Sequence, residues 1–199
     1  NIDVEHGKNP ENAIYGYVLL PGKTSKEMAE YAKSNGIMIL ANTEQLQAAA
    51  DVESGVSGYN FWTAGESAVP KESGITKITS DAPASVTMFN DGSKKIRLAV
   101  SDPTQKSKTI TLRLEGTGLS AAEGDEGVAM SADASGITIT LDVSGKSGTT
   151  FNATINSENA TSGEAIKYAV VTLHYPEETT DVDFVKLNTK YSDPMFEME

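Results

Sequence analysis

Alternation between apolar and polar residues is the feature of this sequence that most constrains its fold. From residue 86 onward, apolar side chains recur at every second position, the spacing that turns one side of a β-strand toward a core. These positions are Val86 and Met88; Ile96, Leu98 and Val100; Ile110, Leu112 and Leu114; Ile137, Ile139, Leu141 and Val143; Phe151, Ala153 and Ile155; and Ala169, Val171 and Leu173. Turn-forming sequences separate the runs. The pattern predicts a small two-sheet antiparallel β-sandwich with strands over about residues 75–175.

The first 62 residues combine strand and helix signals. Residues 14–20 are rich in aromatic and β-branched side chains and end at Pro21-Gly22, which predicts a strand followed by a turn. Thr24 and Glu27 have the spacing of a capping box, so we expect a short helix that ends at Asn35-Gly36. Residues 37–40 predict a buried strand, and residues 42–47 fit either a helical turn or another strand.

Two further segments suggest how the chain is organised. Residues 63–74 have no apolar period, so we expect a boundary between two units there, with residues 1–66 forming one and residues 67–175 the other. The acidic tail, residues 176–199, contains Val182, Phe184, Val185 and Leu187. This spacing predicts an edge strand at 182–187 followed by a frayed end.

Charge and composition exclude several classes of function. The formal net charge of −12 at pH 7 argues against a nucleic acid or an anionic membrane as partner, because phosphate groups are bound by basic patches. The absence of cysteine rules out disulfides and thiolate metal sites. No run of 18 apolar residues is present, so we expect no membrane span. The chain starts at Asn1 without Met or a signal peptide, within a strand-like pattern, and we expect it to be a fragment.

Several short motifs resemble one known family. The segment 6–21, HGKNPENAIYGYVLLP, is followed in order by ILANTE at 39–44, Gln47-Ala48, Asn60-Phe61-Trp62 and AVSDPTQ at 99–105. This order is similar to that in polysaccharide lyase family 8, which includes hyaluronate, chondroitin AC and xanthan lyases. The resemblance extends from residue 1 to about residue 175. It implies that residues 1–66 end a large central β-sandwich and that residues 67–175 form a small terminal one.

The resemblance also implies a function. These lyases cleave uronic-acid polysaccharides, such as hyaluronan, chondroitin or xanthan, by β-elimination, and their catalytic Asn, His, Tyr and Arg come from a helical toroid domain that precedes this region. The chain alone is therefore expected to be inactive, with no catalytic residue, no metal and no cofactor. Its expected partners are the N-terminal catalytic portion of the same enzyme and, through it, an acidic polysaccharide. The resemblance further implies a bacterial, secreted or cell-surface protein.

Four side chains are candidates for a site. His6 has the chemistry of a general base, but a hydrogen-bonded structural histidine is the expected role at a strand end. His174 is expected on a partly exposed sheet face, and two histidines without clustered carboxylates do not predict a transition-metal site. Tyr59 and Trp62 are weak candidates for substrate binding, because an aromatic ring can stack on a sugar, with core packing as the alternative.

Two other functions fit the same sequence. The first alternative is a free-standing carbohydrate-binding module, which an exposed row of aromatic side chains along one sheet would favour. The second is an adhesin or stalk domain with an immunoglobulin-like sandwich, which an isolated sandwich with termini at opposite ends would favour.

Overall fold

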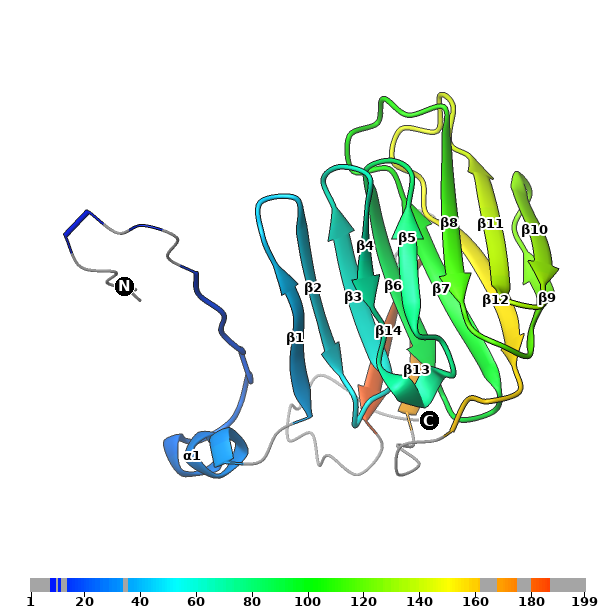
Figure 1. Ribbon diagram of the computed structural model, residues 1–199. Helices are drawn as coiled ribbons and strands as arrows, with labels where there is room; N and C mark the ends of the chain where they lie inside the picture. The colour runs from blue at the N-terminus through cyan, green and yellow to red at the C-terminus, as the bar shows by residue number, and fades with distance from the viewer. Residues whose placement is uncertain are drawn as a thin grey trace.

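The protein is mainly β, with two antiparallel sheets packed face to face (Figure 1). The computed structural model describes residues 8–9, 11, 14–33, 36–161, 168–174 and 180–186. One short helix, α1 (Ser25–Lys33), lies outside the sandwich on the side of β1 (Ile37–Asn42). The mainly β class expected from the alternation is confirmed, with one helix before the first strand.

Each sheet of the sandwich draws strands from both halves of the chain. The seven-stranded sheet has the order β1-β2-β3-β6-β7-β12-β9, where β2 is Leu46–Asp51, β3 Val56–Phe61, β6 Ala84–Asn90, β7 Lys95–Ser101, β12 Phe151–Ser157 and β9 Leu119–Gly124. The five-stranded sheet has the order β10-β11-β8-β5-β4, where β10 is Val128–Asp133, β11 Gly136–Asp142, β8 Thr109–Glu115, β5 Lys77–Ser80 and β4 Gly65–Ala68. A separate pair joins β13 (Tyr168–His174) to β14 (Thr180–Lys186).

The core lies between the two large sheets and is built from the predicted alternation. The inward positions of β6, β7, β8, β11 and β12 are buried and belong to one hydrophobic cluster. Burying a Leu or Ile side chain completely stabilises a fold by roughly 1.5–3 kcal/mol, so this cluster is the main source of stability. The side chains of β13 and β14 lie outside the described part of the structure.

The predicted helix start is confirmed. The Thr24 backbone N–H donates to the Glu27 carboxylate at 2.8 Å, and the Glu27 backbone N–H donates to Thr24 Oγ1 at 3.3 Å. These reciprocal bonds satisfy two of the amide groups that a helix leaves unpaired at its first turn. No residue of α1 is buried, so the helix depends on such local bonds.

Two expectations for the first 62 residues need correction. Residues 14–20 form no strand, because they have no strand partner among the described residues, and most of their side chains are exposed. The strand expected at 37–40 does form as part of β1, but Met38 and Ile39 are exposed rather than buried, because β1 is an edge strand. The ambiguous stretch 42–47 resolves into a turn at Thr43 that leads into β2.

The stretch 63–74, predicted as a boundary, lies within the sandwich. It contains β4 and a short 3₁₀ turn, η1 (Lys71–Ser73), and β3 before it pairs directly with β6 after it. The absence of an apolar period reflects an edge strand and a tight turn. Gly74 ends that turn at φ 71°, and a Cβ on it would lie 2.7 Å from Ser157 Oγ. Strands from 37 to 157 thus share one core, whereas the place of residues 1–33 in a larger sandwich stays a prediction.

The acidic tail contains one described element. β14 (Thr180–Lys186) covers most of the predicted edge strand and pairs antiparallel with β13. Residues 187–199, where a frayed end was expected, lie outside the described residues.

Candidate functional site

The outward faces of the two large sheets differ in chemistry. The five-stranded sheet presents threonines and ion pairs, including Lys77, which contacts Glu115 at 2.9 Å and Glu66 at 3.1 Å. The hydrogen bonds that Lys77 donates to these two carboxylates raise its pKa. On the same face the Arg113 guanidinium, 2.8 Å from Asp133, lowers the pKa of that carboxyl. Paired charges of this kind are typical of a sheet face that stays in water.

The seven-stranded sheet presents a groove with no charged side chain along its described lining. The floor is a row of cross-strand neighbours, Ile39, Ala49, Gly58, Thr87 and Ala99. The next row on the same face, two residues further along β2, β3, β6 and β7, consists of Asn42, Gln47, Asn60, Ser85 and Ser101. The groove has a volume of about 620 Å³ and is open to solvent along its length. Its lining therefore offers amide and hydroxyl groups above a shallow floor.

Hydrogen bonds hold the amide row in place. The Ser85 hydroxyl donates to Asn60 Oδ1 at 2.8 Å, which leaves the Asn60 Nδ2 hydrogens without a partner among the described residues. Asn42 Nδ2 donates to the Tyr15 carbonyl at 3.0 Å, so the N-terminal segment closes the β1 end of the groove. The fixed amides can act as donors and acceptors toward a ligand without first being ordered.

The two aromatic candidates occupy opposite sides of the sheet. Tyr59 is only 1 % exposed, packs in the core beside Phe61, and donates its hydroxyl to Ser57 Oγ at 3.1 Å. Burial raises the pKa of Tyr59 to about 12, so the phenol stays protonated. Its ring cannot stack on a sugar from this position, which corrects the expectation for Tyr59.

Trp62 is available to a ligand. Its side chain is 49 % exposed, and its position one residue after the inward Phe61 places it on the face that carries the groove. The indole Nε1–H donates to Gln47 Oε1, and Gln47 lines the groove. Trp62 therefore flanks the amide row, whereas no described contact connects it to Tyr59.

The expected roles of the two histidine candidates stay predictions. His6 lies outside the described residues. His174 ends β13, and its side chain is likewise outside the described part of the structure.

The motif residue Asp102 has a structural role. Its Oδ1 accepts hydrogen bonds from the Thr104 N–H and hydroxyl, and its Oδ2 accepts from the N–H groups of Lys106 and Ser107, all four at 2.7–2.9 Å. Burial alone would raise the pKa of Asp102, but these hydrogen bonds outweigh it and lower the pKa to about 2. The carboxylate thus organises the loop between β7 and β8.

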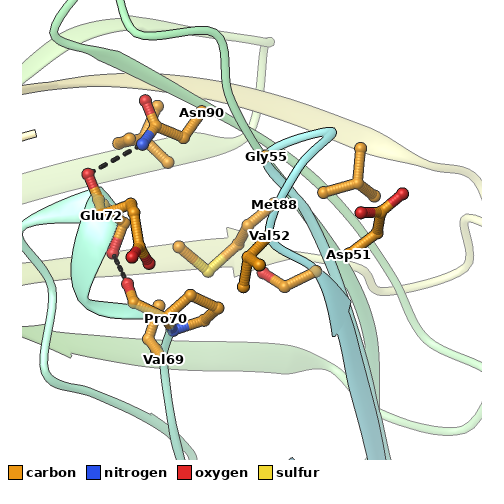
Figure 2. Close-up of a pocket in the computed structure, with 12 residues that line it drawn as sticks. Asp51, Val52, Gly55, Val69, Pro70, Glu72, Met88 and Asn90 are labelled. Carbon is orange, nitrogen blue, oxygen red and sulfur yellow. Dashed lines mark hydrogen bonds between the residues drawn. The ribbon is translucent and has the colours of Figure 1, made fainter. Parts of the chain in front are cut away.

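The cavity inside the sandwich is too small for a substrate. It has a volume of about 20 Å³ and lies near the ends of β3 and β6, among Val52, Val69 and Met88 (Figure 2). At its edge Asn90 Nδ2 donates to the Glu72 carbonyl at 2.8 Å. A space of this size holds about one water molecule. The groove on the outer face is therefore the better candidate site.

The described part of the chain contains neither a metal-binding cluster nor a membrane-spanning helix. Within residues 14–33, 36–161 and the other described stretches, no group of three His, Asp or Glu side chains is placed to hold a metal ion. Across that same part of the chain, no helix has the length and hydropathy needed to cross a bilayer.

The sequence contains a signal for the groove that its charged and aromatic motifs do not reveal. Toward one end of four neighbouring strands, the outward positions are small or uncharged polar, as at Gln47, Asn60, Ser85 and Ser101. Comparison of these positions across the paired strands reveals a neutral patch on the sheet. The register needed for that step is known only once the strands are paired.

Comparison with known proteins identifies the sandwich. Residues 38–111 match the model of the polysaccharide lyase family 8 C-terminal β-sandwich domain. The chain is 36 % identical over 164 residues to a xanthan lyase from Bacillus sp. (strain GL1), 80 % of this chain but 17 % of that protein. It is 39 % identical over 113 residues to a chondroitinase-AC from Pedobacter heparinus, 56 % of this chain and 15 % of that protein.

Solved structures share the fold. A Streptomyces coelicolor A3 chondroitin AC lyase in complex with chondroitin sulphate aligns over 77 % of this chain and 19 % of that one, with a TM-score of 0.65 at 24 % identity. A Paenibacillus xanthan lyase aligns over 77 % of this chain and 16 % of that one, with a TM-score of 0.61 at 23 % identity. The chain thus spans less than a fifth of these proteins. It carries the C-terminal β-sandwich domain of polysaccharide lyase family 8.

Proposed function

We propose that this chain is the non-catalytic C-terminal portion of a secreted or cell-surface bacterial polysaccharide lyase, bound to the preceding catalytic portion of the same enzyme. The parent enzyme would cleave hyaluronan, chondroitin or xanthan by β-elimination. The relatives named above support this, because they are xanthan and chondroitin lyases that extend far beyond the matched region. The role of this chain is architectural: it supports the catalytic portion that binds and cleaves the polymer.

The observation that carries the proposal is an exposed apolar surface formed by residues 14–19 with Ile39, whose side chain lies beside Gly16. Tyr17 is 73 % exposed and Ile39 59 %, and Ile14, Tyr15 and Leu19 are also exposed. Soluble monomers rarely leave a contiguous apolar patch of more than a few hundred Å² in water. β1 lies beside this surface at the edge of the seven-stranded sheet, and an edge strand is a common site of pairing with another chain.

The charged groups of the described residues support a non-catalytic role. The pKa shifts of Asp102, Asp133 and Lys77 are caused by hydrogen bonds that stabilise a loop or a sheet face, and none of these groups lines the groove. Structural hydrogen-bond and ion-pair networks shift pKa values as active sites do, and these three groups belong to such networks. In this proposal, proton abstraction takes place in the catalytic portion of the parent enzyme.

Reconstitution from two separate polypeptides tests the proposed contact. The chain and the preceding portion of its parent enzyme are expressed as separate polypeptides, mixed, and analysed by sedimentation velocity. We expect a one-to-one complex, and we expect the double variant Tyr17→Asp/Ile39→Asp to abolish it, because two charges would be buried at an apolar contact. The control, Thr140→Asp on the opposite outer face, should form the complex normally.

Two results would count against the proposal. One is a mixture in which the two polypeptides sediment separately at micromolar concentrations. The other is a complex that survives the double variant but is lost in the Thr140→Asp control, which would place the contact on the other sheet.

A further inference from the structure

We propose that the groove on the seven-stranded sheet binds an uncharged oligosaccharide, with Trp62 and the amides of Gln47 and Asn60 as its contacts. The inference concerns a site on the sandwich itself and does not depend on the lyase function proposed above.

Gly58 gives the first reason. It lies in the middle of β3, a central strand, where glycine costs roughly 0.5–1 kcal/mol relative to alanine. Its φ is not positive, and a Cβ built on it would meet no atom within 4 Å. Neither the backbone nor the packing of this chain therefore requires glycine there. A glycine of this kind in a strand is typical of a place where a ligand approaches the backbone closely.

Small side chains continue the floor of the groove from Gly58 across the neighbouring strands. Ala49 and Thr87 are its direct neighbours on the two adjacent strands, followed by Ala99 on β7. From Ile39 to Ala99 the row crosses four strand spacings, about 19 Å at the usual interval. A floor of this length accommodates an extended chain of several sugar rings.

The chemistry of the walls selects the ligand. Amide and hydroxyl groups recognise sugar hydroxyls by hydrogen bonds, and an exposed aromatic ring packs against the apolar face of a pyranose. Asn60 Nδ2 and Trp62 provide these two kinds of contact side by side. The positive charges of this face, Lys95 and Arg97, lie at the other end of β7 from Ser101, and Arg97 is paired with Asp91 at 3.0 Å. The groove thus favours a neutral sugar over a uronate.

The chain provides its own reporter, because Trp62 is the only tryptophan. The full 199-residue protein is titrated with cellohexaose while tryptophan fluorescence is followed, and isothermal titration calorimetry gives a second readout. A chondroitin hexasaccharide is titrated in parallel as the charged counterpart. We expect saturable binding of cellohexaose and at least about tenfold weaker binding of the charged chain, a difference of about 1.4 kcal/mol.

Three variants locate the site. Gly58→Phe covers the floor from a position whose Cβ would meet no atom within 4 Å, and it is expected to weaken binding of cellohexaose at least tenfold in calorimetry while leaving the protein folded. Trp62→Ala is expected to weaken it about fivefold or more, as removal of a stacking ring does. Thr140→Phe places the same aromatic group on the opposite outer face and should bind like the parent protein.

Each alternative outcome overturns the inference. Absence of saturable binding by both methods at millimolar cellohexaose would refute a neutral-sugar site. Binding of the chondroitin hexasaccharide as tightly as cellohexaose would refute the selectivity for an uncharged sugar. Unchanged affinity in Gly58→Phe, with its fold confirmed by circular dichroism, would place any bound sugar elsewhere. If the groove is instead filled by the catalytic portion, adding that portion should shift the Trp62 emission while cellohexaose has no effect.

Discussion

Removal of the Asp102 carboxylate should destabilise the sandwich strongly, although Asp102 belongs to no site. The side chain is 3 % exposed and accepts four hydrogen bonds that fix the loop between β7 and β8. A hydrogen bond to a charged group contributes about 1.5–3 kcal/mol, and the four are not additive because exposed donors of the loop can turn to water. We expect Asp102→Ala to lower the free energy of unfolding by about 2–4 kcal/mol.

Asp102→Asn separates charge from shape. The amide keeps one acceptor oxygen but directs its N–H₂ group at two of the four donors in either orientation, so we expect a loss of about 2 kcal/mol at pH 7. The folded pKa of Asp102 is about 2, below the unfolded value of about 3.9. The carboxylate therefore contributes stability that is fully present above about pH 4 and is lost as the pH falls toward 2.

Urea unfolding of the parent protein and of Asp102→Asn, at pH 7 and again near pH 2.5, checks this reasoning. The difference in unfolding free energy between the parent protein and Asp102→Asn should shrink at the lower pH, because protonation of Asp102 removes the stabilising carboxylate. Asp142→Asn is the control, because Asp142 is exposed and its carboxylate accepts a hydrogen bond from the Ser144 N–H at 3.1 Å. It should change the free energy of unfolding by less than about 0.5 kcal/mol. A difference that stays the same at both pH values would refute the assignment.

Three further changes test other parts of the structure. Gly55→Ala should cost about 2–4 kcal/mol by urea unfolding, because φ is 68° and the added Cβ would lie 2.1 Å from the Asn90 carbonyl; a cost below 1 kcal/mol would contradict this turn geometry. Tyr59→Phe should cost about 1 kcal/mol by losing the bond to Ser57, with no effect on sugar binding if Tyr59 is a core residue. Thr24→Ala should reduce the helical signal in circular dichroism by fraying α1 while leaving the sandwich transition unchanged, and a shifted transition would show that α1 supports the core.

The sequence predicted those elements whose side chains repeat in a simple period. Ile110, Leu112 and Leu114 alternate because β8 has one face on the core, and the Thr24–Glu27 spacing is a local rule that needs no tertiary contact. The boundary expected at 63–74 failed for a physical reason. An edge strand and a turn around Gly74 carry no apolar period even though they are packed inside the domain.

The candidate site was harder to predict because it depends on register. Tyr59 and Trp62 are three residues apart, so alternation alone places them on opposite faces, but only the burial of Tyr59 shows which face is the core. Gly58 carries no motif, and its meaning follows from the open space above it. The exposure of residues 14–19 likewise could not be read from a segment whose composition is typical of a strand.

Lyase turnover tests most directly whether this chain is the non-catalytic portion of a polysaccharide lyase. The 199-residue chain, the preceding portion of the parent enzyme and their mixture are each incubated with hyaluronan, chondroitin and xanthan, and the unsaturated uronate product is followed by ultraviolet absorbance. We expect no turnover by the chain alone and turnover with at least one polymer whenever the catalytic portion is present. Turnover by the chain alone at rates of ordinary enzymes, about 1 s⁻¹ or more, would contradict it.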